Sequence, residues 1–163
     1  MGSFIEYKCE GCGYSFKAAT GFGFGYPSQF QGAVEAARKG QYGKEYRRKI
    51  LFHEGWLGRI AAIDLTRAIA QCEDCGAYQA IVDDTLYVLP RKSYPGLRIW
   101  TGSQKEFFIT PEEMRTHGKV MGEIDHHCQD CGGKLHVIEG EPKELPCPKC
   151  GSMMMQRLDA LWD

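Results

Sequence analysis

Four short stretches of this chain follow one pattern, Cys-x-x-Cys-Gly. They are Cys9-Glu10-Gly11-Cys12-Gly13, Cys72-Glu73-Asp74-Cys75-Gly76, Cys128-Gln129-Asp130-Cys131-Gly132 and Cys147-Pro148-Lys149-Cys150-Gly151. Together they contain all eight cysteines of the 163-residue chain. Two residues between the cysteines let one tight turn aim both sulfurs at a single ion, and the following glycine takes a positive φ without steric cost. We call each stretch a knuckle.

The four knuckles predict two metal sites. Two knuckles supply the closed set of four thiolates that holds a structural zinc ion, so four of them predict two Zn²⁺ per chain. A single Cys-x-x-Cys in a cytosolic protein also fits a redox dithiol, but four copies with no cysteine left over disfavour it. The predicted ligands are Cys9, Cys12, Cys72, Cys75, Cys128, Cys131, Cys147 and Cys150.

The spacing of the knuckles suggests which of them share an ion. Fifteen residues separate Cys131 from Cys147, which falls in the common range for zinc-binding pairs. We therefore expect the third and fourth knuckles to form one site and, by elimination, the first and second, 59 residues apart, to form the other. A crossed arrangement, first with third and second with fourth, is an open alternative that closes longer loops before any metal binds.

Composition and charge exclude several classes of protein. Hydrophobic residues make up 43% and charged residues 25%, an ordinary globular balance. The formal net charge of −1 argues against a general nucleic-acid binder. No run approaches the roughly 18 apolar residues of a membrane span, and the N-terminus lacks the pattern of a signal peptide. We expect a cytoplasmic protein without a membrane partner, with its thiols reduced.

The pattern of residues predicts an α+β protein with two zinc ribbons of four cysteine ligands each, the first ribbon split by a helical insertion. The expected parts are a split ribbon over 1–90 with its insertion at about 28–56, a connector over 91–118, and a C-terminal ribbon over 119–163. Strands are expected on both sides of the first knuckle (4–18), an extended segment over 66–71, a hairpin turning at Asp83-Asp84, and strand-like pieces at 97–100 and 106–110. Two helices are expected, one from a Ser28 cap to Lys39 and one over Lys44 to His53. A third, short helix should begin with a capping box from Thr110 to Glu113.

Two parts of the chain resemble known metal-binding proteins. The start, Phe4-Ile5-Glu6-Tyr7-Lys8-Cys9 through Phe16, resembles the N-terminal ribbons of small bacterial regulatory-type zinc-ribbon proteins, and the whole layout is similar to uncharacterised bacterial zinc-ribbon proteins. The resemblance implies β-ribbon geometry at Cys9 and Cys12. It does not point to any particular activity. The stretch from Leu145 to Gly151 resembles the second knuckle of rubredoxins, which hold iron. Aromatic residues, which often shield iron centres, are sparse in 126–156, so we expect zinc rather than iron.

No motif in the chain predicts catalysis. Neither H-E-x-x-H nor G-x-S-x-G occurs, and Pro146-Cys147-Pro148-Lys149-Cys150 lacks the H-x-E partner of the zinc deaminases. A site with four thiolates also lacks the open coordination position that a catalytic zinc keeps for water. We therefore expect a non-enzymatic adaptor or regulatory protein whose metal is structural. The alternative function is a rubredoxin-like iron electron carrier.

Two stretches are candidate partner surfaces. Six basic residues and one acid lie between Arg38 and Lys49, and Arg47, Arg48 and Lys49 form the candidate contact, although a solvated helix face is the plainer interpretation. A protein is the expected partner; a nucleic acid is the second candidate, which the net charge does not support. The aromatic residues Phe22, Phe24, Tyr26 and Phe30 fit either the core or a second surface, and we favour the core.

Overall fold

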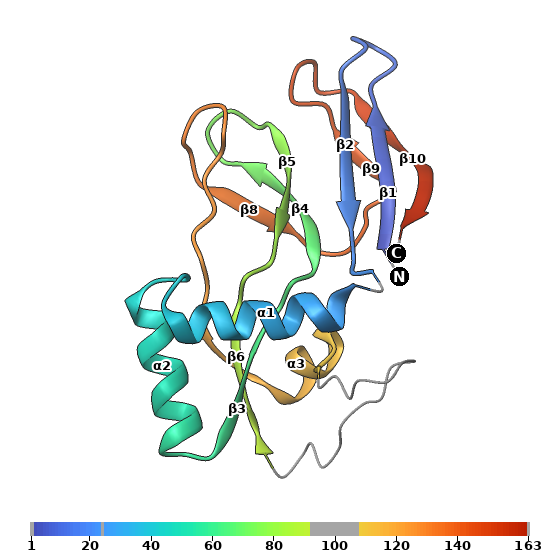
Figure 1. Ribbon diagram of the computed structural model, residues 1–163. Coiled ribbons are helices and arrows are strands. Elements are labelled where there is room, and N and C mark those ends of the chain that lie inside the picture. Colours follow the sequence, from blue (N-terminus) through green and yellow to red (C-terminus); the bar gives the residue numbers. More distant parts are fainter. Residues whose placement is uncertain (1, 24, 92–107, 163) are drawn as a thin grey trace. The chain divides into compact units, whose positions relative to one another are not determined.

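The computed structural model describes residues 2–23, 25–91 and 108–162, and this part of the chain contains three helices and ten strands (Figure 1). The α+β class is therefore confirmed. The chain forms two compact units: unit 1 comprises Met1–Phe24, Thr66–Asp83 and Asp125–Asp163, and unit 2 comprises Gly25–Leu65 and Asp84–Ile124. This division does not follow the expected boundaries near residues 90 and 119, because the segments around both positions belong to unit 2.

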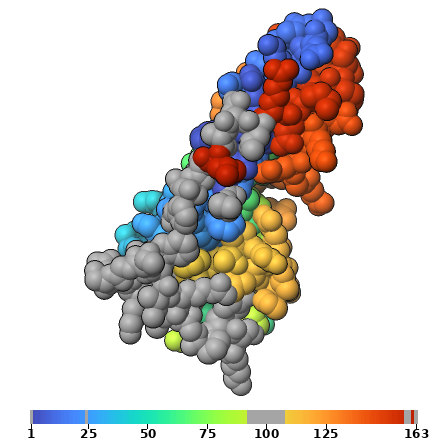
Figure 2. Space-filling view, turned by 90° about the vertical axis from the view of Figure 1, so that its right-hand side faces the viewer, coloured from blue at the N-terminus to red at the C-terminus, as the bar shows by residue number. Residues whose placement is uncertain are grey.

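Unit 1 contains two small antiparallel sheets. The first has the strand order β2-β1-β10-β9 and the second the order β5-β4-β8. The strands are β1 (Gly2–Lys8), β2 (Ser15–Thr20), β4 (Arg67–Cys72), β5 (Tyr78–Val82), β8 (Leu135–Ile138), β9 (Glu144–Pro146) and β10 (Met153–Trp162). Strand β1 thus pairs with β10, so the blue N-terminal and red C-terminal segments lie side by side in Figure 2.

The two sheets of unit 1 share a core. Alternate side chains of β1, with Ile5 and Tyr7 buried, meet Met154 of β10 and Ile69 of β4 in one apolar cluster. The buried tyrosines also find polar partners: the Tyr7 hydroxyl donates to the Pro142 carbonyl at 2.5 Å. Burial raises the pKa of Tyr7 to about 12, with a further contribution from Glu141, so this hydroxyl stays a donor. Each ribbon thus covers the other's apolar face, which neither small sheet could bury alone.

Unit 2 packs three helices with the three-stranded sheet β3-β6-β7. Its elements are α1 (Tyr26–Lys39), α2 (Lys44–Gly55), β3 (Arg59–Ile63), β6 (Leu86–Pro90), α3 (Pro111–His117) and β7 (Lys119–Gly122). The central strand β6 is buried at every residue from Leu86 to Leu89. Tyr26 and Phe30 of α1 are also buried, which confirms the core interpretation for these two aromatic residues. Phe22 is half-buried, and Phe24 lies outside the described residues.

Several local predictions are confirmed. Helix α1 ends at Gly40, whose φ of 89° gives the left-handed cap. Helix α3 begins with the expected capping box, in which the Thr110 hydroxyl accepts from the Glu113 amide and the Glu113 carboxylate accepts from the Thr110 amide. Strand β4 covers the extended segment expected over 66–71. The strand-like pieces expected at 97–100 and in the first part of 106–110 lie outside the described residues.

Two local predictions are wrong. Ser28 does not cap α1, because the helix begins earlier, at Tyr26, with Pro27 in its first turn and Gly25 as the N-cap. The hairpin turning at Asp83-Asp84 does not form either: β5 pairs with β4, and β6 pairs with β3. The run from Leu86 to Leu89 is apolar at every position, which fits a strand buried on both faces better than an arm of a two-stranded hairpin.

Among the residues that the structure describes, no helix combines the length and the apolar character that crossing a bilayer requires.

Candidate metal centres

Each knuckle has the same backbone geometry. In the first, the Cys9 amide donates to the Tyr14 carbonyl at 2.8 Å and the Gly13 amide donates to the Cys9 carbonyl at 3.0 Å. The other three repeat this pair of bonds. The four glycines that follow the second cysteines have φ between 71° and 78°, as the sequence predicts. In every knuckle the first cysteine is buried and the second exposed, so each turn presents one sulfur from the core and one from the rim.

The eight sulfurs gather into two quartets, and each quartet can hold a metal ion. The outer site consists of Cys9, Cys12, Cys147 and Cys150, and the inner site of Cys72, Cys75, Cys128 and Cys131. Within each quartet all sulfurs lie within 4.8 Å of one another. None of the eight cysteines forms a disulfide. All the predicted ligands therefore belong to a site.

The predicted pairing of the knuckles is wrong, and so is the crossed alternative. The first knuckle pairs with the fourth and the second with the third, so the inner site is nested within the outer one along the sequence. The reason is the β-sheet: β1 leads into the first knuckle and β10 leaves the fourth, and these two strands pair over their whole common length. Strands β4 and β8 bring the second and third knuckles together in the same way.

The sulfur positions fit tetrahedral coordination. The sulfurs of Cys9 and Cys150 lie 3.4 Å apart, as do those of Cys72 and Cys131. The opposite pairs are Cys12 with Cys147 at 3.6 Å and Cys75 with Cys128 at 3.7 Å. A tetrahedron with metal–sulfur bonds of about 2.3 Å has sulfurs about 3.8 Å apart, so a small contraction or expansion of each quartet accommodates the ion.

Hydrogen bonds from the knuckles stabilise thiolates. The backbone amide and the hydroxyl of Ser152, together with the neighbouring thiols, lower the pKa of Cys150 to about 6. At the inner site the backbone amide of Cys75 is the main cause that lowers the pKa of Cys72 to about 7. Because metals bind the thiolate form, each quartet begins with one sulfur that is at least partly ionised near neutral pH.

At some thiols the effect of the knuckle amide on the pKa is outweighed by other causes. The Tyr14 amide lowers the pKa of Cys12, but burial and the neighbouring thiols together raise it to about 12. A metal ion must therefore displace protons from the remaining sulfurs, which makes metal binding dependent on pH.

The outer site lies beside aromatic rings. Cys9 and Cys147 belong to the same apolar cluster as Tyr7 and Tyr78, with Tyr14 packed against it. The Lys149 ammonium lies 5.3 Å from the centre of the Tyr14 ring. The outer site therefore has aromatic neighbours although residues 126–156 contain few aromatic residues. These rings belong to the N-terminal hairpin and to β5.

The inner site has polar surroundings. The Gln79 side-chain amide donates to the Cys128 sulfur at 3.4 Å, and the Gly133 amide donates to the Cys131 sulfur at 3.4 Å. The apolar residues packed around Cys72 and Cys128 are Ala70, Leu135 and Ile81, with no ring among the described residues of this cluster. Gly133 must remain small, because a Cβ there would lie 2.9 Å from the Cys72 sulfur. The two centres thus differ in environment although their knuckles are alike.

The candidate partner residues lie in unit 2, on α2. Arg47 and Arg48 are exposed. Lys49 is half-buried and forms an ion pair of 2.7 Å with Glu45, one turn earlier. The structure therefore leaves two of the three predicted contact residues available to a partner.

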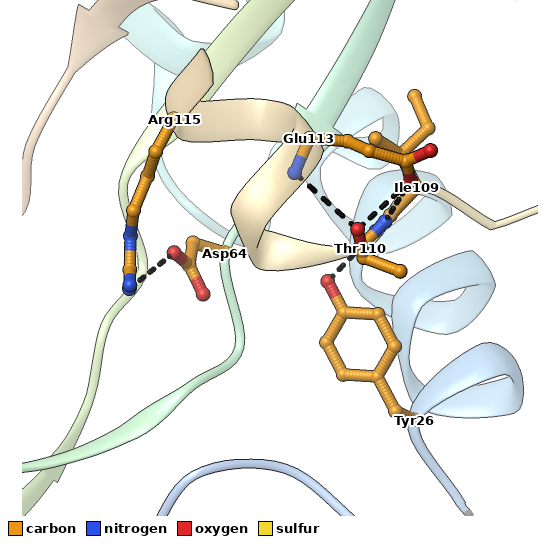
Figure 3. Close-up of polar contacts among 6 residues, drawn as sticks. All are labelled: Tyr26, Asp64, Ile109, Thr110, Glu113 and Arg115. Carbon is orange, nitrogen blue, oxygen red and sulfur yellow. Dashed lines mark hydrogen bonds and ion pairs between the residues drawn. The ribbon is translucent and has the colours of Figure 1, made fainter.

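A second polar cluster, in unit 2, was not predicted from the sequence. Asp64 is completely buried and accepts a hydrogen bond of 2.8 Å from Arg115 on α3 (Figure 3). Nearby, the buried Tyr26 hydroxyl donates to the Ile109 carbonyl at 3.0 Å. Asp64 follows the buried strand β3 directly, but a single acid at a strand end is too common a pattern to predict a buried pair. These contacts tie α1, α3 and β3 together and give the cluster a structural role.

Comparison with known proteins adds no relative. The chain matches no protein-family model, no curated protein and no solved structure. The likeness to bacterial zinc-ribbon proteins therefore stays a prediction from the N-terminal residues.

Proposed function

We propose that the protein is a non-enzymatic adaptor or regulatory protein in which two zinc ions are structural and unit 1 depends on them. The observation that carries this proposal is the composition of its core. Among the described residues of unit 1, thirteen apolar ones are buried, and four of them are the first cysteines of the knuckles. Metal binding would add the folding free energy that such a small core lacks.

The ligand set supports a structural rather than a catalytic role. Each ion would receive four thiolates, so no coordination position is left for water or substrate. The knuckle amides and Ser152 hydrogen-bond the sulfurs and thus stabilise the bound state. The polar cluster around Asp64 offers no catalytic arrangement, because its carboxylate is already engaged by Arg115.

The environment of the outer site favours a second candidate function. Tyr14 and Tyr78 lie beside Cys147, and such rings commonly shield iron–thiolate centres from water. With iron in the outer site the protein would be an electron carrier of the rubredoxin type. Zinc in both sites accounts equally well for the geometry, because the two metals accept the same tetrahedral thiolate set.

The partner is expected to be anionic, because the basic residues Arg47 and Arg48 are the exposed part of the predicted contact. The sequence favours a protein over a nucleic acid. A protein is the favoured partner because the net charge of the whole chain, −1, does not support nucleic-acid binding.

Metal analysis of protein purified under reducing conditions tests the proposal. We expect a colourless sample with about two zinc ions per chain. The His127→Ala variant is the matched control: His127 adjoins Cys128 but belongs to neither quartet, so it should keep both ions. A red sample containing iron with a reversible redox couple would establish the electron carrier instead. Metal-free protein with unit 1 folded would contradict the structural role of the metal.

A further inference from the structure

One side of α2 presents cations and aromatic rings in a single row. Lys44, Arg48, Phe52 and Trp56 follow each other at intervals of four residues, so they lie along one side of the helix, about 6 Å apart along its axis. Trp56 caps the helix in a helical conformation and continues the row. We call these four residues the α2 ridge.

The aromatic members of the α2 ridge are exposed, although the Phe52 ring also makes an edge-on contact with the ring of His53, 5.4 Å between centroids. The relative exposure of Phe52 is 52% and that of Trp56 is 84%. The opposite side of the helix, with Tyr46, Ile50 and His53, is buried in unit 2. Two exposed rings on a helix that is already anchored on its other side indicate a contact surface.

The charge beside the α2 ridge is positive and not neutralised. The helix has two acids, and both are already engaged: Glu45 with Lys49 at 2.7 Å, and Glu54 with Arg38 at 2.7 Å. Lys44, Arg47 and Arg48 form no ion pair with any residue that the structure describes. The ridge therefore favours an anionic partner.

The net charge of −1 argues against nucleic-acid binding by the whole chain, but the two units differ in charge. Unit 1 contains 7 Lys and Arg against 12 Asp and Glu, a formal charge of −5. Unit 2 contains 13 against 9, a formal charge of +4. The value of −1 for the whole chain thus hides a basic unit, and it is this unit that contains the α2 ridge.

We propose that the α2 ridge binds single-stranded nucleic acid. Lys44, Arg48 and the neighbouring Arg47 would contact phosphates, while unstacked bases would lie on Phe52 and Trp56. Cations that follow the backbone next to rings on which bases stack are the combination that sequence-tolerant single-strand binders use. This proposal rests on the proposed function in one respect, since it names the partner of a binding protein.

Other occupants fit the surface less well. A helix that lies on a membrane separates a cationic side from an apolar side, whereas here cations and exposed rings share one side, and Tyr46 and Ile50 on the other side face the core. A second copy would bring cations against cations. Duplex DNA keeps its bases stacked and offers no ring faces to Phe52 or Trp56. An acidic protein segment satisfies the cations but would need apolar side chains of its own to cover the exposed rings.

Binding of labelled oligo(dT) and oligo(U) of about 12 nucleotides to the metal-loaded full chain tests the proposal. We expect binding at about 50 mM salt that weakens as salt rises, with a slope of about −0.7 in the logarithmic plot for each phosphate contact. The Arg48→Ala variant should bind more weakly and reduce the slope by about 0.7. Absence of binding of both oligonucleotides at this salt concentration would overturn the proposal.

Variants of the two aromatic residues test whether bases stack on the α2 ridge. Phe52→Ala and Trp56→Ala should each weaken binding by between about 5- and 150-fold while the salt slope stays unchanged. Lys17→Ala, which removes an exposed cation of unit 1, and Leu57→Ala, which removes an exposed apolar side chain beyond the ridge, are matched controls and should bind like the wild type. An equal loss of oligonucleotide affinity in the control variants and in the ridge variants would contradict binding at the α2 ridge.

Vesicles containing phosphatidylglycerol distinguish the membrane alternative. Binding of vesicles without binding of oligonucleotides would overturn the proposal and identify a membrane contact. The metal content of each variant is measured in parallel. Because the ridge variants lie in unit 2, we expect all of them to keep about two ions. A failure of the oligonucleotide assay with both ions bound would refute the ridge proposal and leave the structural role of the metal intact.

Discussion

Units 1 and 2 are nearly equal in length, with 81 and 82 residues, but their cores differ in composition. Among the described residues, unit 2 has sixteen buried apolar ones, none of them a cysteine. Unit 1 has thirteen, four of which are cysteines of the candidate metal sites. The difference teaches that one short chain can combine a unit with a conventional core and a unit whose core is built in part from cysteines that could hold metal ions.

The comparison extends to charge. A zinc ion with four thiolates carries a formal charge of −2, so two ions would bring unit 1 from −5 to about −9. Unit 2 remains at +4. Metal binding therefore increases the contrast between the units, and an anionic ligand should approach unit 2 rather than unit 1.

Removing the metal should produce the largest difference in stability between the two units. Structural zinc contributes on the order of 10 kcal/mol in small metal-binding domains, so a chelator under reducing conditions should unfold unit 1. We expect amide protection to disappear in β1, β4, β8 and β10 but to persist in β3, β6 and the buried side of α1. Simultaneous loss of protection in both units would show that unit 2 also depends on the metal.

The buried Asp64 provides a perturbation of unit 2 alone. Arg115→Ala removes the guanidinium that pairs with this carboxylate, and we expect unit 2 to lose about 2 kcal/mol, because Arg115 is half-exposed and water replaces part of the interaction. Arg115→Lys keeps the charge and should lose less. Protection factors of the β3 and β6 amides measure the effect. A loss confined to unit 1, or an equal loss in the Lys variant, would contradict the assigned role.

The smallest expected effect concerns His53. This side chain is buried on α2, and its Nδ1 has no hydrogen-bond partner among the described residues. Burial, and then the cations Arg59 of β3 and Lys119 of β7, lower the pKa of His53 below its usual value. The unfolded chain therefore binds the proton more readily, so this contribution to stability is complete above pH about 6.5 and is lost as the pH falls towards the folded pKa.

Amide exchange of unit 2 at pH values above and below about 6.5 tests the His53 prediction. The wild type should lose protection in α2 and β3 at the lower pH, and His53→Gln should lose less. Because metal binding also weakens in acid, the comparison uses unit 2 amides and a variant with unchanged cysteines. Identical pH dependence in the two proteins would show that His53 is not the titrating group.

Local sequence signals predicted most of the local structure. The glycines after the knuckles, the Gly40 cap and the capping box of Thr110 and Glu113 each depend on a few adjacent residues, and each is confirmed. All eight cysteines of the two candidate metal sites could be identified for the same reason. Ser28 shows the limit of such signals, because the N-cap lies three residues earlier, at Gly25, and the helix begins at the buried Tyr26.

Long-range pairing could not be predicted from the same signals. The expected pairing closes a loop of 15 residues, whereas the outer site closes one of 134. Because loop entropy grows only with the logarithm of length, this difference amounts to about 2 kcal/mol. Seven residue pairs between β1 and β10, with Ile5, Tyr7 and Met154 buried, outweigh it. Nothing in the residues of either strand alone identifies the other as its partner.

The nested pairing of the knuckles is the central claim, and two double variants test it directly. Cys12→Ser with Cys150→Ser alters only the outer site, whereas Cys12→Ser with Cys75→Ser alters both sites. At a chelator concentration at which the wild type keeps both ions, the first variant should lose one ion and the second should lose both. The reverse result, two ions lost from the first variant and one from the second, would contradict the nested arrangement and restore the pairing of adjacent knuckles.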